Sequence, residues 1–198
     1  MNYLAHALLS FDKTDILAGN IISDFVKGKA KFYYPEGIQK GIHLHRLIDT
    51  FTDNHPLTAK GKSYFRPHYR LYSGPFMDVV YDHFLACDEK QFEVYGNLEM
   101  FSRNVYHSLE LNFVLFPAPF QKMFSYMKLQ NWLYNYRLKK GIQNSFRGLA
   151  YRAAYLNESA VAFEIFNQYY HELENCYVDF FPELKKFAFN NLSNLLAG

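Results

Sequence analysis

Acidic, amide and imidazole side chains recur at a spacing of four residues within the first 85 residues of this chain. On a helix, this spacing places both members of a pair on one face, one turn apart. Helical bundles build metal sites in their cores from carboxylate and imidazole groups on facing helices. The pattern therefore indicates a metal-dependent hydrolase. The pairs are Asn2 and His6, Asn20 and Asp24, His45 and Asp49, Asp49 and Asp53, and Asp78 and Asp82.

The densest group of these residues falls within one predicted helix. There His45, Asp49 and Asp53 form a polar ladder beside an apolar stripe. His43 lies about 200° around the helix axis from His45, so the two imidazoles cannot face the same ion on a regular helix. Arg46 lies one turn from His43 and from Asp49, which suits it to hold a phosphate or to orient Asp49. The alternative is an amphipathic helix whose acids pair with Arg46.

A second group places carboxylates in an apolar helix. Asp78 and Asp82 share one face, His83 adjoins it, and the neighbouring side chains are mostly apolar. Because an unpaired buried charge is costly, these carboxylates need partners. A divalent cation meets that need, and so does Arg or Lys from another helix. Asp24 and His6, on further apolar helices, add donors to a set that suits Mn²⁺, Mg²⁺ or Fe²⁺ rather than a thiolate-binding ion.

Composition favours a globular protein of one domain. The chain has 198 residues, of which 49% are apolar and 19% aromatic, enough to bury a sizeable core. A net charge of only +2 argues against a general affinity for nucleic acid. Cys87 and Cys176 form no zinc motif and suit a reducing compartment. The N-terminus does not read as a signal peptide and no stretch reads as a membrane span, so we expect a cytoplasmic protein.

Helices must position these candidate residues, because the chain has helical rather than alternating periodicity throughout. Proline and glycine mark the expected helix ends. We predict one all-α domain over residues 1–198, a single helical bundle. The expected helices begin with the stripe from Leu4 to Leu9 and continue over 16–26, 35–54, 56–66, 76–86, 90–115, 117–136, 139–154, 157–178 and 182–196.

Four motifs together resemble the acyl carrier protein phosphodiesterase family, which is regarded as a divergent branch of the HD metal-dependent phosphohydrolases. None is specific singly, but they occur in the expected order. They are Asn2-Tyr3-Leu4-Ala5-His6, Gly19-Asn20-x-x-x-Asp24-Phe25-Val26-x-Gly28, Gly41-Ile42-His43-x-His45-Arg46-x-x-Asp49-x-x-Thr52-Asp53 and Asp78-x-x-x-Asp82-His83-Phe84. The resemblance continues through Asn131-Trp132-Leu133-x-x-Tyr136-Arg137, Gly141-Ile142 and Leu149-Ala150-x-Arg152.

The resemblance implies an HD-like fold and hydrolysis of the phosphodiester that joins 4′-phosphopantetheine to a serine of holo acyl carrier protein. The implied products are the apo carrier and phosphopantetheine, and the implied cofactor is Mn²⁺ or Mg²⁺. One departure matters for the site. The adjacent His-Asp dipeptide of the HD superfamily is absent, because this chain has Asp82-His83 in the reverse order. The ligand set therefore remains a hypothesis about spacing.

The metal ligands are expected among the carboxylates and imidazoles borne by the helices. A bound metal would lower the pKa of a water molecule and neutralise the phosphoryl oxygens. The predicted ligands are Asp24, His45, Asp49 and Asp82, with His6 and Asp78 as further ligands or supporting groups. The residues expected to orient ligands or cap helices are Asn2, Asn20 and Asp53.

Two histidines and an arginine are predicted to assist the reaction. His83 or His43 would protonate the departing serine oxygen, a role that suits an imidazole near neutral pH. Arg46 would hold the phosphate by paired hydrogen bonds.

Basic side chains near the site are predicted to bind the acidic carrier. Lys27, Lys29 and Lys31 follow directly on Asp24, and Arg137 lies in a second basic segment that extends towards Arg147 and Arg152. The alternative for both segments is a solvated surface. Docking of an acidic partner would make the association rate sensitive to salt.

Two other functions are compatible with the pattern. The first keeps the metal but acts on a nucleotide or another small phosphoester. The second is a non-catalytic helical module that binds the carrier or another acidic partner. Acids repeated on apolar helices argue against this module, which has little reason to bury them.

Overall fold

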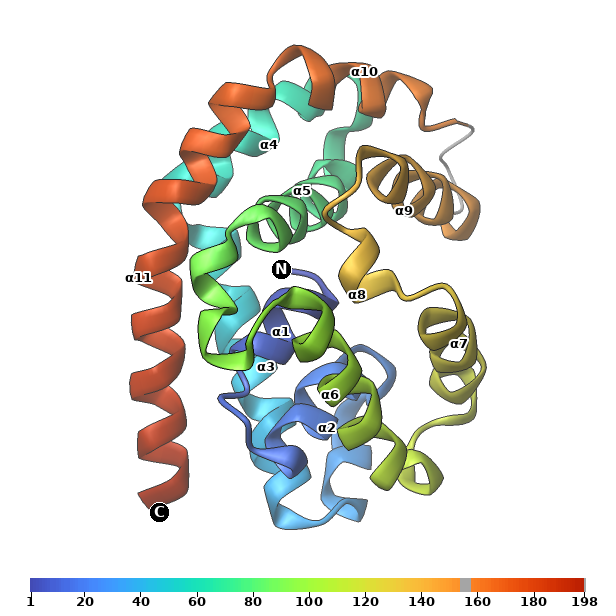
Figure 1. The fold of residues 1–198 in the computed structure, drawn as a ribbon, viewed down its shortest axis with the longest axis vertical. Coiled ribbons are helices and arrows are strands. Elements are labelled where there is room, and N and C mark those ends of the chain that lie inside the picture. Colours follow the sequence, from blue (N-terminus) through green and yellow to red (C-terminus); the bar gives the residue numbers. More distant parts are fainter. Residues whose placement is uncertain (154–157, 198) are drawn as a thin grey trace.

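The computed structural model describes residues 1–153 and 158–197, and these residues contain helices and connecting turns but no strand. The prediction of an all-α fold is therefore confirmed (Figure 1). The α-helices are α1 (Tyr3–Leu8), α2 (Thr14–Ile22), α3 (Glu36–Asn54), α4 (Pro56–Tyr69), α5 (Ser73–Cys87), α6 (Leu98–Leu111), α7 (Ala118–Leu129), α8 (Trp132–Asn135), α9 (Lys139–Arg152), α10 (Ala160–Gln168) and α11 (Tyr170–Ala197). The 3₁₀ turns are η1 (Ser23–Phe25), η2 (Gly28–Tyr33), η3 (Arg70–Tyr72), η4 (Glu89–Gln91), η5 (Glu93–Tyr95) and η6 (Phe113–Leu115).

Three predicted helices have different bounds in the structure. The helix expected over 90–115 begins only at Leu98, because Gly96, at φ +87°, separates it from two 3₁₀ turns. The helix expected over 117–136 is broken at Asn131, whose φ is +46°. The helix expected over 157–178 is interrupted at Tyr169, which separates α10 from α11. The predicted ends at 154 and 157 lie outside the described residues.

Proline does not end a helix at either place where a break was expected. Pro67 lies inside α4 and Pro182 lies inside α11, which runs unbroken from Tyr170 to Ala197. Proline removes one hydrogen bond within a helix and normally kinks it. Near Pro182, the buried side chains of Phe180, Phe181 and Leu184 hold α11 against the core. Burial of this apolar face offsets the lost hydrogen bond.

Helices α2 and α3 cross with their backbones in contact. The crossing is formed by Gly19 and Gly41, and a Cβ atom on either glycine would overlap a backbone carbonyl oxygen of the facing helix. Only glycine permits so close an approach. The crossing places Asn20 of α2 against His45 of α3.

Helix α1 is held against α5 by its first turn. The Asp82 carboxylate on α5 accepts hydrogen bonds from the backbone N–H groups of Asn2, Leu4 and Ala5 at 3.3, 2.7 and 3.2 Å. A carboxylate at a helix N-terminus satisfies donors that have no partner within the helix. This contact fixes α1, and with it His6, beside the crossing of α2 and α3.

The cysteines and the length of the apolar helices were also considered in the sequence, and the structure describes both. Cys87 is exposed, Cys176 is buried, and the two thiols are free. Within the described part of the chain, no helix combines the length and the apolar character needed to cross a bilayer.

Candidate metal centre

Three side chains from two helices converge to form a histidine–aspartate cluster, defined here as His6, His45 and Asp49. His6 comes from α1, whereas His45 and Asp49 come from consecutive turns of α3. One ligand atom from each side chain lies within 4.8 Å of the other two. Both imidazoles are buried, and Asp49 is partly exposed. The spacing of four residues between His45 and Asp49 therefore places both groups at one site.

The Nε2 atoms of the two imidazoles face the same carboxylate. His45 Nε2 lies 3.0 Å from Asp49 Oδ2, and His6 Nε2 lies 3.2 Å from Asp49 Oδ1. The rings stack with their centroids 4.0 Å apart and their planes 15° from parallel. A second carboxylate approaches from the η1 turn, where Asp24 Oδ1 lies 3.4 Å from His45 Nε2. His45 Nε2 thus lies next to two carboxylates, one from its own helix and one from the η1 turn.

Asn20 holds both imidazoles through their other ring nitrogen. Its side-chain oxygen accepts from His6 Nδ1 at 2.8 Å, and its backbone carbonyl accepts from His45 Nδ1 at 2.7 Å. The Asn20 amide nitrogen donates to the His6 carbonyl and to Ser10 Oγ. This pair of bonds defines which end of the amide is oxygen, because a flipped amide would face a carbonyl oxygen with its own oxygen. Both Nδ1 atoms are therefore donors.

This hydrogen bonding leaves a buried site in need of a cation. A neutral imidazole that carries its proton on Nδ1 presents a lone pair at Nε2. The His6 lone pair consequently faces the Asp49 carboxylate, so that two acceptors oppose each other. His6 Nε2, His45 Nε2 and Asp49 Oδ1 are buried and have no hydrogen-bonding partner among the described residues. A divalent metal ion fits this donor set, because histidines that bind metal commonly donate the other N–H to a carbonyl or carboxylate.

Burial and the neighbouring carboxylates give the two imidazoles different pKa values, and therefore different protonation states near neutral pH. Burial, reinforced by the neighbouring His45, lowers the pKa of His6 to about 4. Against the opposing effect of burial, the neighbouring Asp24 and Asp49 carboxylates raise the pKa of His45 to about 9. Burial also opposes ionisation of Asp49, but the two histidines hold its pKa well below the usual range. His6 is thus neutral near pH 7, whereas His45 carries a proton until a metal displaces it.

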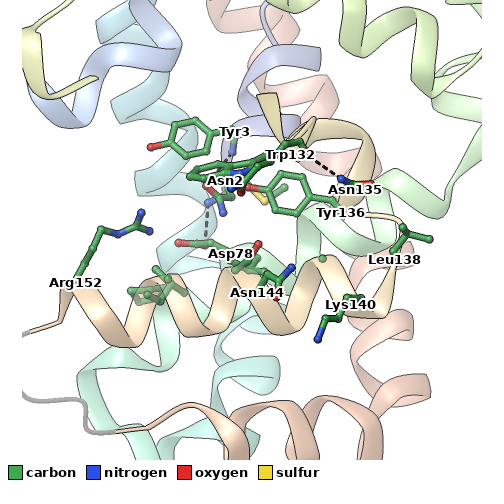
Figure 2. A pocket seen from close by; sticks show the side chains of 18 of the residues that line it. Asn2, Tyr3, Asp78, Trp132, Asn135, Tyr136, Leu138, Lys140, Asn144 and Arg152 are labelled. Atoms are coloured by element: carbon green, nitrogen blue, oxygen red, sulfur yellow. Dashed lines mark hydrogen bonds and ion pairs between the residues drawn. The ribbon is translucent and has the colours of Figure 1, made fainter. Parts of the chain in front are cut away.

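A cavity of about 580 Å³ adjoins the cluster. Asp24 lines the cavity and also contacts His45, so it connects the two. Figure 2 shows that helix α9 carries Asn144 and Arg152 along one side, with Tyr3, Trp132 and Tyr136 opposite and Asp78 between them. A ligand in the cavity can therefore contact Asp24, which in turn contacts His45.

Other predicted metal ligands have different partners in the structure. Asp82 uses both carboxylate oxygens to cap α1, and burial raises its pKa to about 7 although the backbone donors oppose the rise. Asp78 lines the cavity and accepts from the Met1 ammonium group at 2.9 Å. That ammonium group is buried and also lies 3.7 Å from Asp49 Oδ1. Asp78 and Met1 therefore support the cluster electrostatically from the cavity side.

The predicted acid His83 is engaged elsewhere. Its Nδ1 atom lies 2.7 Å from the Tyr136 carbonyl oxygen, and its Nε2 atom lies 2.9 Å from the Tyr170 hydroxyl. Burial lowers its pKa. Neither ring nitrogen is directed at the histidine–aspartate cluster, and this geometry does not support the predicted proton transfer.

The remaining predicted residues lie on the surface around the cluster. His43 and Arg46 are exposed on α3, and the Arg46 guanidinium donates to the Val26 carbonyl. Asp53 forms an ion pair with Lys62 at 2.7 Å. Asn2 caps α1 through its side chain. Lys27 and Lys29 are exposed and Lys31 is half-buried in or beside the η2 turn, and Arg137 is exposed and stacks on Tyr134.

Sequence reasoning missed the walls of the cavity. Trp132 and Tyr136 lie in a segment without acids at helical spacing, so nothing in their pattern indicated a site. Arg152 was grouped only with other basic residues of its segment. The segment contains Trp132, the only tryptophan of the sequence, and Tyr136 follows four residues later. This aromatic pair is the signal that could have drawn attention to the segment.

Fold and site together define a class of protein: an all-α protein in which a histidine–carboxylate cluster suited to a divalent metal lies beside a cavity. The family model for acyl carrier protein phosphodiesterase matches residues 1–184. The chain therefore belongs to the acyl carrier protein phosphodiesterase family.

Curated relatives cover nearly the whole chain. The acyl carrier protein phosphodiesterase of Yersinia pestis is 33% identical over 188 residues, which cover 95% of this chain and 97% of the relative. The enzyme of the same name from Serratia proteamaculans is also 33% identical over 188 residues, with the same coverage. That of Photorhabdus laumondii is 29% identical over 190 residues, or 96% of each chain. No solved structure matches the chain.

Proposed function

We propose that this protein is a metal-dependent phosphodiesterase that removes 4′-phosphopantetheine from the serine of holo acyl carrier protein. The products are apo carrier and phosphopantetheine. Membership of the family supports the substrate. The observation that carries the metal dependence is the buried lone pair of His6 Nε2, which faces the Asp49 carboxylate at 3.2 Å.

Mn²⁺ or Mg²⁺ is the proposed cofactor, with Fe²⁺ as a further candidate, because imidazole and carboxylate ligands suit these ions. His6, His45 and Asp49 would hold the ion, and Asp24 would complete the set from the cavity side. A metal ion bound there supplies Lewis-acid polarisation of the phosphate and lowers the pKa of water.

The residues of the chain prepare the site before any substrate arrives. Asn20 keeps both imidazoles in the tautomer that directs Nε2 inward. Asp82 fixes α1 and thereby the position of His6. Because these contacts are already formed, the ligands need little reordering on binding, and precise placement is what catalysis requires of supporting residues.

Several roles remain proposals. We retain His43 as the candidate acid for the serine oxygen; it is exposed on α3, about 200° around the helix axis from His45, so the serine would have to approach from that exposed side. Arg46 remains a candidate for orienting the phosphate from the same exposed side. The HD-like relationship of the fold is likewise a proposal.

Acyl carrier protein is the proposed partner, and its acidic surface would meet Lys27, Lys29 and Lys31 next to Asp24. Lys27 and Lys29 are exposed and Lys31 is half-buried, and all three follow within a few residues of Asp24, which lines the cavity. Arg137 would extend the contact. We place the enzyme in the cytoplasm, where its proposed substrate is used, and propose no nucleic-acid partner.

The decisive experiment is incubation of the purified protein with holo acyl carrier protein and Mn²⁺, followed by mass spectrometry of the carrier. We expect loss of the mass of the prosthetic group and no loss in the presence of a chelator. A nucleotide and a generic phosphodiester are assayed in parallel. An unchanged carrier, together with hydrolysis of the nucleotide, would replace the proposed substrate.

A matched pair of variants tests the metal site. Asp49→Asn should lower the rate by more than the ~10–100-fold that loss of a supporting contact to a metal ligand costs. Asp53→Asn, on the next turn of the same helix, should retain the rate because Asp53 pairs with Lys62 at the surface. Metal dependence would be refuted if Asp49→Asn retained the rate of Asp53→Asn and if both rates persisted undiminished in the presence of a chelator.

A further inference from the structure

The cavity beside the cluster has the walls of a ligand site. Its volume of about 580 Å³ falls within the range of about 300–1,000 Å³ that small-molecule sites span. The aromatic rings of Tyr3, Trp132 and Tyr136 line one side, and α9 with Leu149 lines the other. Aromatic and aliphatic walls suit the alkyl and dimethyl parts of a flexible chain.

Polar groups without partners interrupt these apolar walls. The Tyr136 hydroxyl, the Asn144 amide and the Ser145 hydroxyl have no hydrogen bond to another side chain or backbone group in the described part of the chain. Tyr136 itself is a buried residue. Convergent unpaired donors and acceptors indicate a ligand that carries amide or hydroxyl groups along its length.

Besides the Met1 ammonium group, which is paired with Asp78, two lining residues carry positive charge, and they differ in orientation. Lys140 contacts Gln143, and Figure 2 shows its amine directed away from the cavity. Arg152 lines the cavity at the C-terminal end of α9, and Figure 2 shows its guanidinium group turned towards the side on which Tyr3 lies. Tyr3 belongs to α1, the helix that also carries His6, so this guanidinium group lies on the α1 side of the cavity. A planar guanidinium is well suited to bind a phosphate through two parallel hydrogen bonds.

We propose that this cavity is the binding site for the pantetheine arm, and that Arg152 binds the phosphate at the end of the arm next to the metal ligands. Pantetheine is an extended chain with two amides, a hydroxyl, two methyl groups and a terminal thiol, and these groups match the alternation of apolar and polar lining. The proposal rests on the proposed function for its choice of ligand. It adds that the enzyme recognises the prosthetic group and not only the carrier.

Binding can be measured without turnover, because Trp132 is the only tryptophan of the chain and lines the cavity. We expect 4′-phosphopantetheine to change the intrinsic fluorescence in a saturable way, and pantetheine to do so more weakly. Inorganic phosphate should compete with phosphopantetheine but leave pantetheine binding unchanged. Absence of any saturable change with either pantetheine compound would overturn the proposal.

The role of Arg152 is tested by the difference in affinity between the two compounds. Loss of a charge-assisted phosphate contact costs about 1.5–3 kcal/mol, a factor of roughly 10–100. Arg152→Gln should therefore bind the two compounds with similar affinity, whereas Arg147→Gln should retain the preference for phosphopantetheine. Arg147 is exposed on the same helix and is absent from the cavity lining. An undiminished preference in Arg152→Gln would exclude Arg152 as the phosphate ligand.

A second pair of variants tests whether the ligand binds within the cavity. Gly148 lines it, and a Cβ atom there would meet no heavy atom within 4 Å among the described residues. Gly148→Leu should abolish the fluorescence response while the fold is retained, because leucine favours a helix more than glycine does. Gly148→Ala should bind nearly as the parent does. Full pantetheine binding by the leucine variant would place the arm elsewhere.

The outcomes separate this proposal from the proposed function. Hydrolysis of holo carrier without detectable binding of pantetheine compounds would leave the function standing and remove the pantetheine site. Binding that depends on Arg152 and Gly148, without hydrolysis of any holo carrier, would retain the site and remove the function.

Discussion

At the scale of residues, the histidine–aspartate cluster is organised by the ring nitrogens that point away from it. Both Nδ1 atoms donate to oxygens of one residue, Asn20. The inward direction of the Nε2 lone pairs follows from those two bonds. The cluster therefore depends on a buried amide that contacts neither metal nor substrate.

Replacement of that amide should weaken metal binding. Asn20→Ala removes the acceptor for His6 Nδ1 and leaves the His45 contact, which involves the backbone, in place. We expect the Mn²⁺ affinity to fall by about 10–100-fold, as measured by isothermal titration calorimetry. Ser10→Ala, which removes only one partner of the Asn20 side chain, serves as control and should cost less. Equal affinities for the parent and Asn20→Ala would show that the amide does not orient His6.

Metal binding should release a proton. The pKa of His45 is raised to about 9, so its imidazole is protonated at pH 7, whereas His6, with a pKa of about 4, is already neutral. The metal needs the His45 lone pair, so about one proton should leave per ion at pH 7. The apparent affinity should then rise about tenfold per pH unit up to about pH 9 and level off above it. Calorimetry in buffers of different protonation enthalpy measures the release, and a buffer-independent enthalpy would contradict it.

The stability of the metal-free protein should change with pH in the opposite direction: it should fall as the pH rises, whereas the metal affinity should rise. A raised pKa of His45 in the folded state adds stability that is present below its unfolded value, near pH 6.5, and is lost as the pH rises towards 9. The metal-free protein should therefore unfold at lower denaturant concentration at pH 9 than at pH 6.5. His45→Gln should flatten this dependence.

The sequence predicted the relative position of two side chains when both lie on one helix. It did not predict which side chains meet when they lie on different helices. The spacing of His45 and Asp49 predicted their side-by-side placement in α3, and the structure places them 3.0 Å apart. Spacing cannot reveal that Asp82 faces the first turn of α1, or that His83 faces Tyr170. Those partners depend on how helices pack, which the pattern of one segment does not encode.

At the scale of elements, the crossing of α2 and α3 sets the distance between Asn20 and His45. Gly19 and Gly41 bring the two backbones together, and the Asn20 carbonyl thereby reaches the imidazole on the facing helix. Helix periodicity predicted both helices, but not that their glycines would meet.

Enlargement of one glycine should therefore affect stability and the site together. In Gly41→Ala, the added methyl group would overlap the Ile16 carbonyl oxygen, and the helices must separate. We expect a loss of about 1–3 kcal/mol in the free energy of unfolding, measured with urea, and a weaker affinity for Mn²⁺. Gly148→Ala, in open space on α9, should not lose stability. A Gly41→Ala variant with parental stability and affinity would mean that the crossing is not close-packed.

At the scale of the whole molecule, charge is distributed to suit docking rather than general attraction. The net charge is only +2, yet three lysines, two of them exposed, lie within or beside one short turn that follows Asp24. A local cluster of this kind steers an acidic partner towards one place on the surface.

The rate of reaction with holo carrier should accordingly depend on salt. We expect kcat/KM to fall as ionic strength rises, and the triple variant Lys27→Gln, Lys29→Gln, Lys31→Gln to lose most of that dependence with kcat nearly unchanged. The matched control replaces Lys60, Lys90 and Lys186, which are exposed elsewhere, and has the same net charge. An equal salt dependence in both triple variants would show that the lysines beside Asp24 do not steer the carrier.

The two halves of the site come from separate stretches of the chain. The cluster and its supporting amide lie between residues 6 and 49, whereas most of the residues that line the cavity lie between 130 and 152, among them Trp132, Tyr136, Asn144, Gly148 and Arg152. Mutations in one stretch leave the covalent neighbours of the other untouched. Natural variation can therefore alter which ligand is accepted while the hydrolytic apparatus stays constant. In the laboratory, exchange of residues 130–152 between relatives offers a modular route to new specificity.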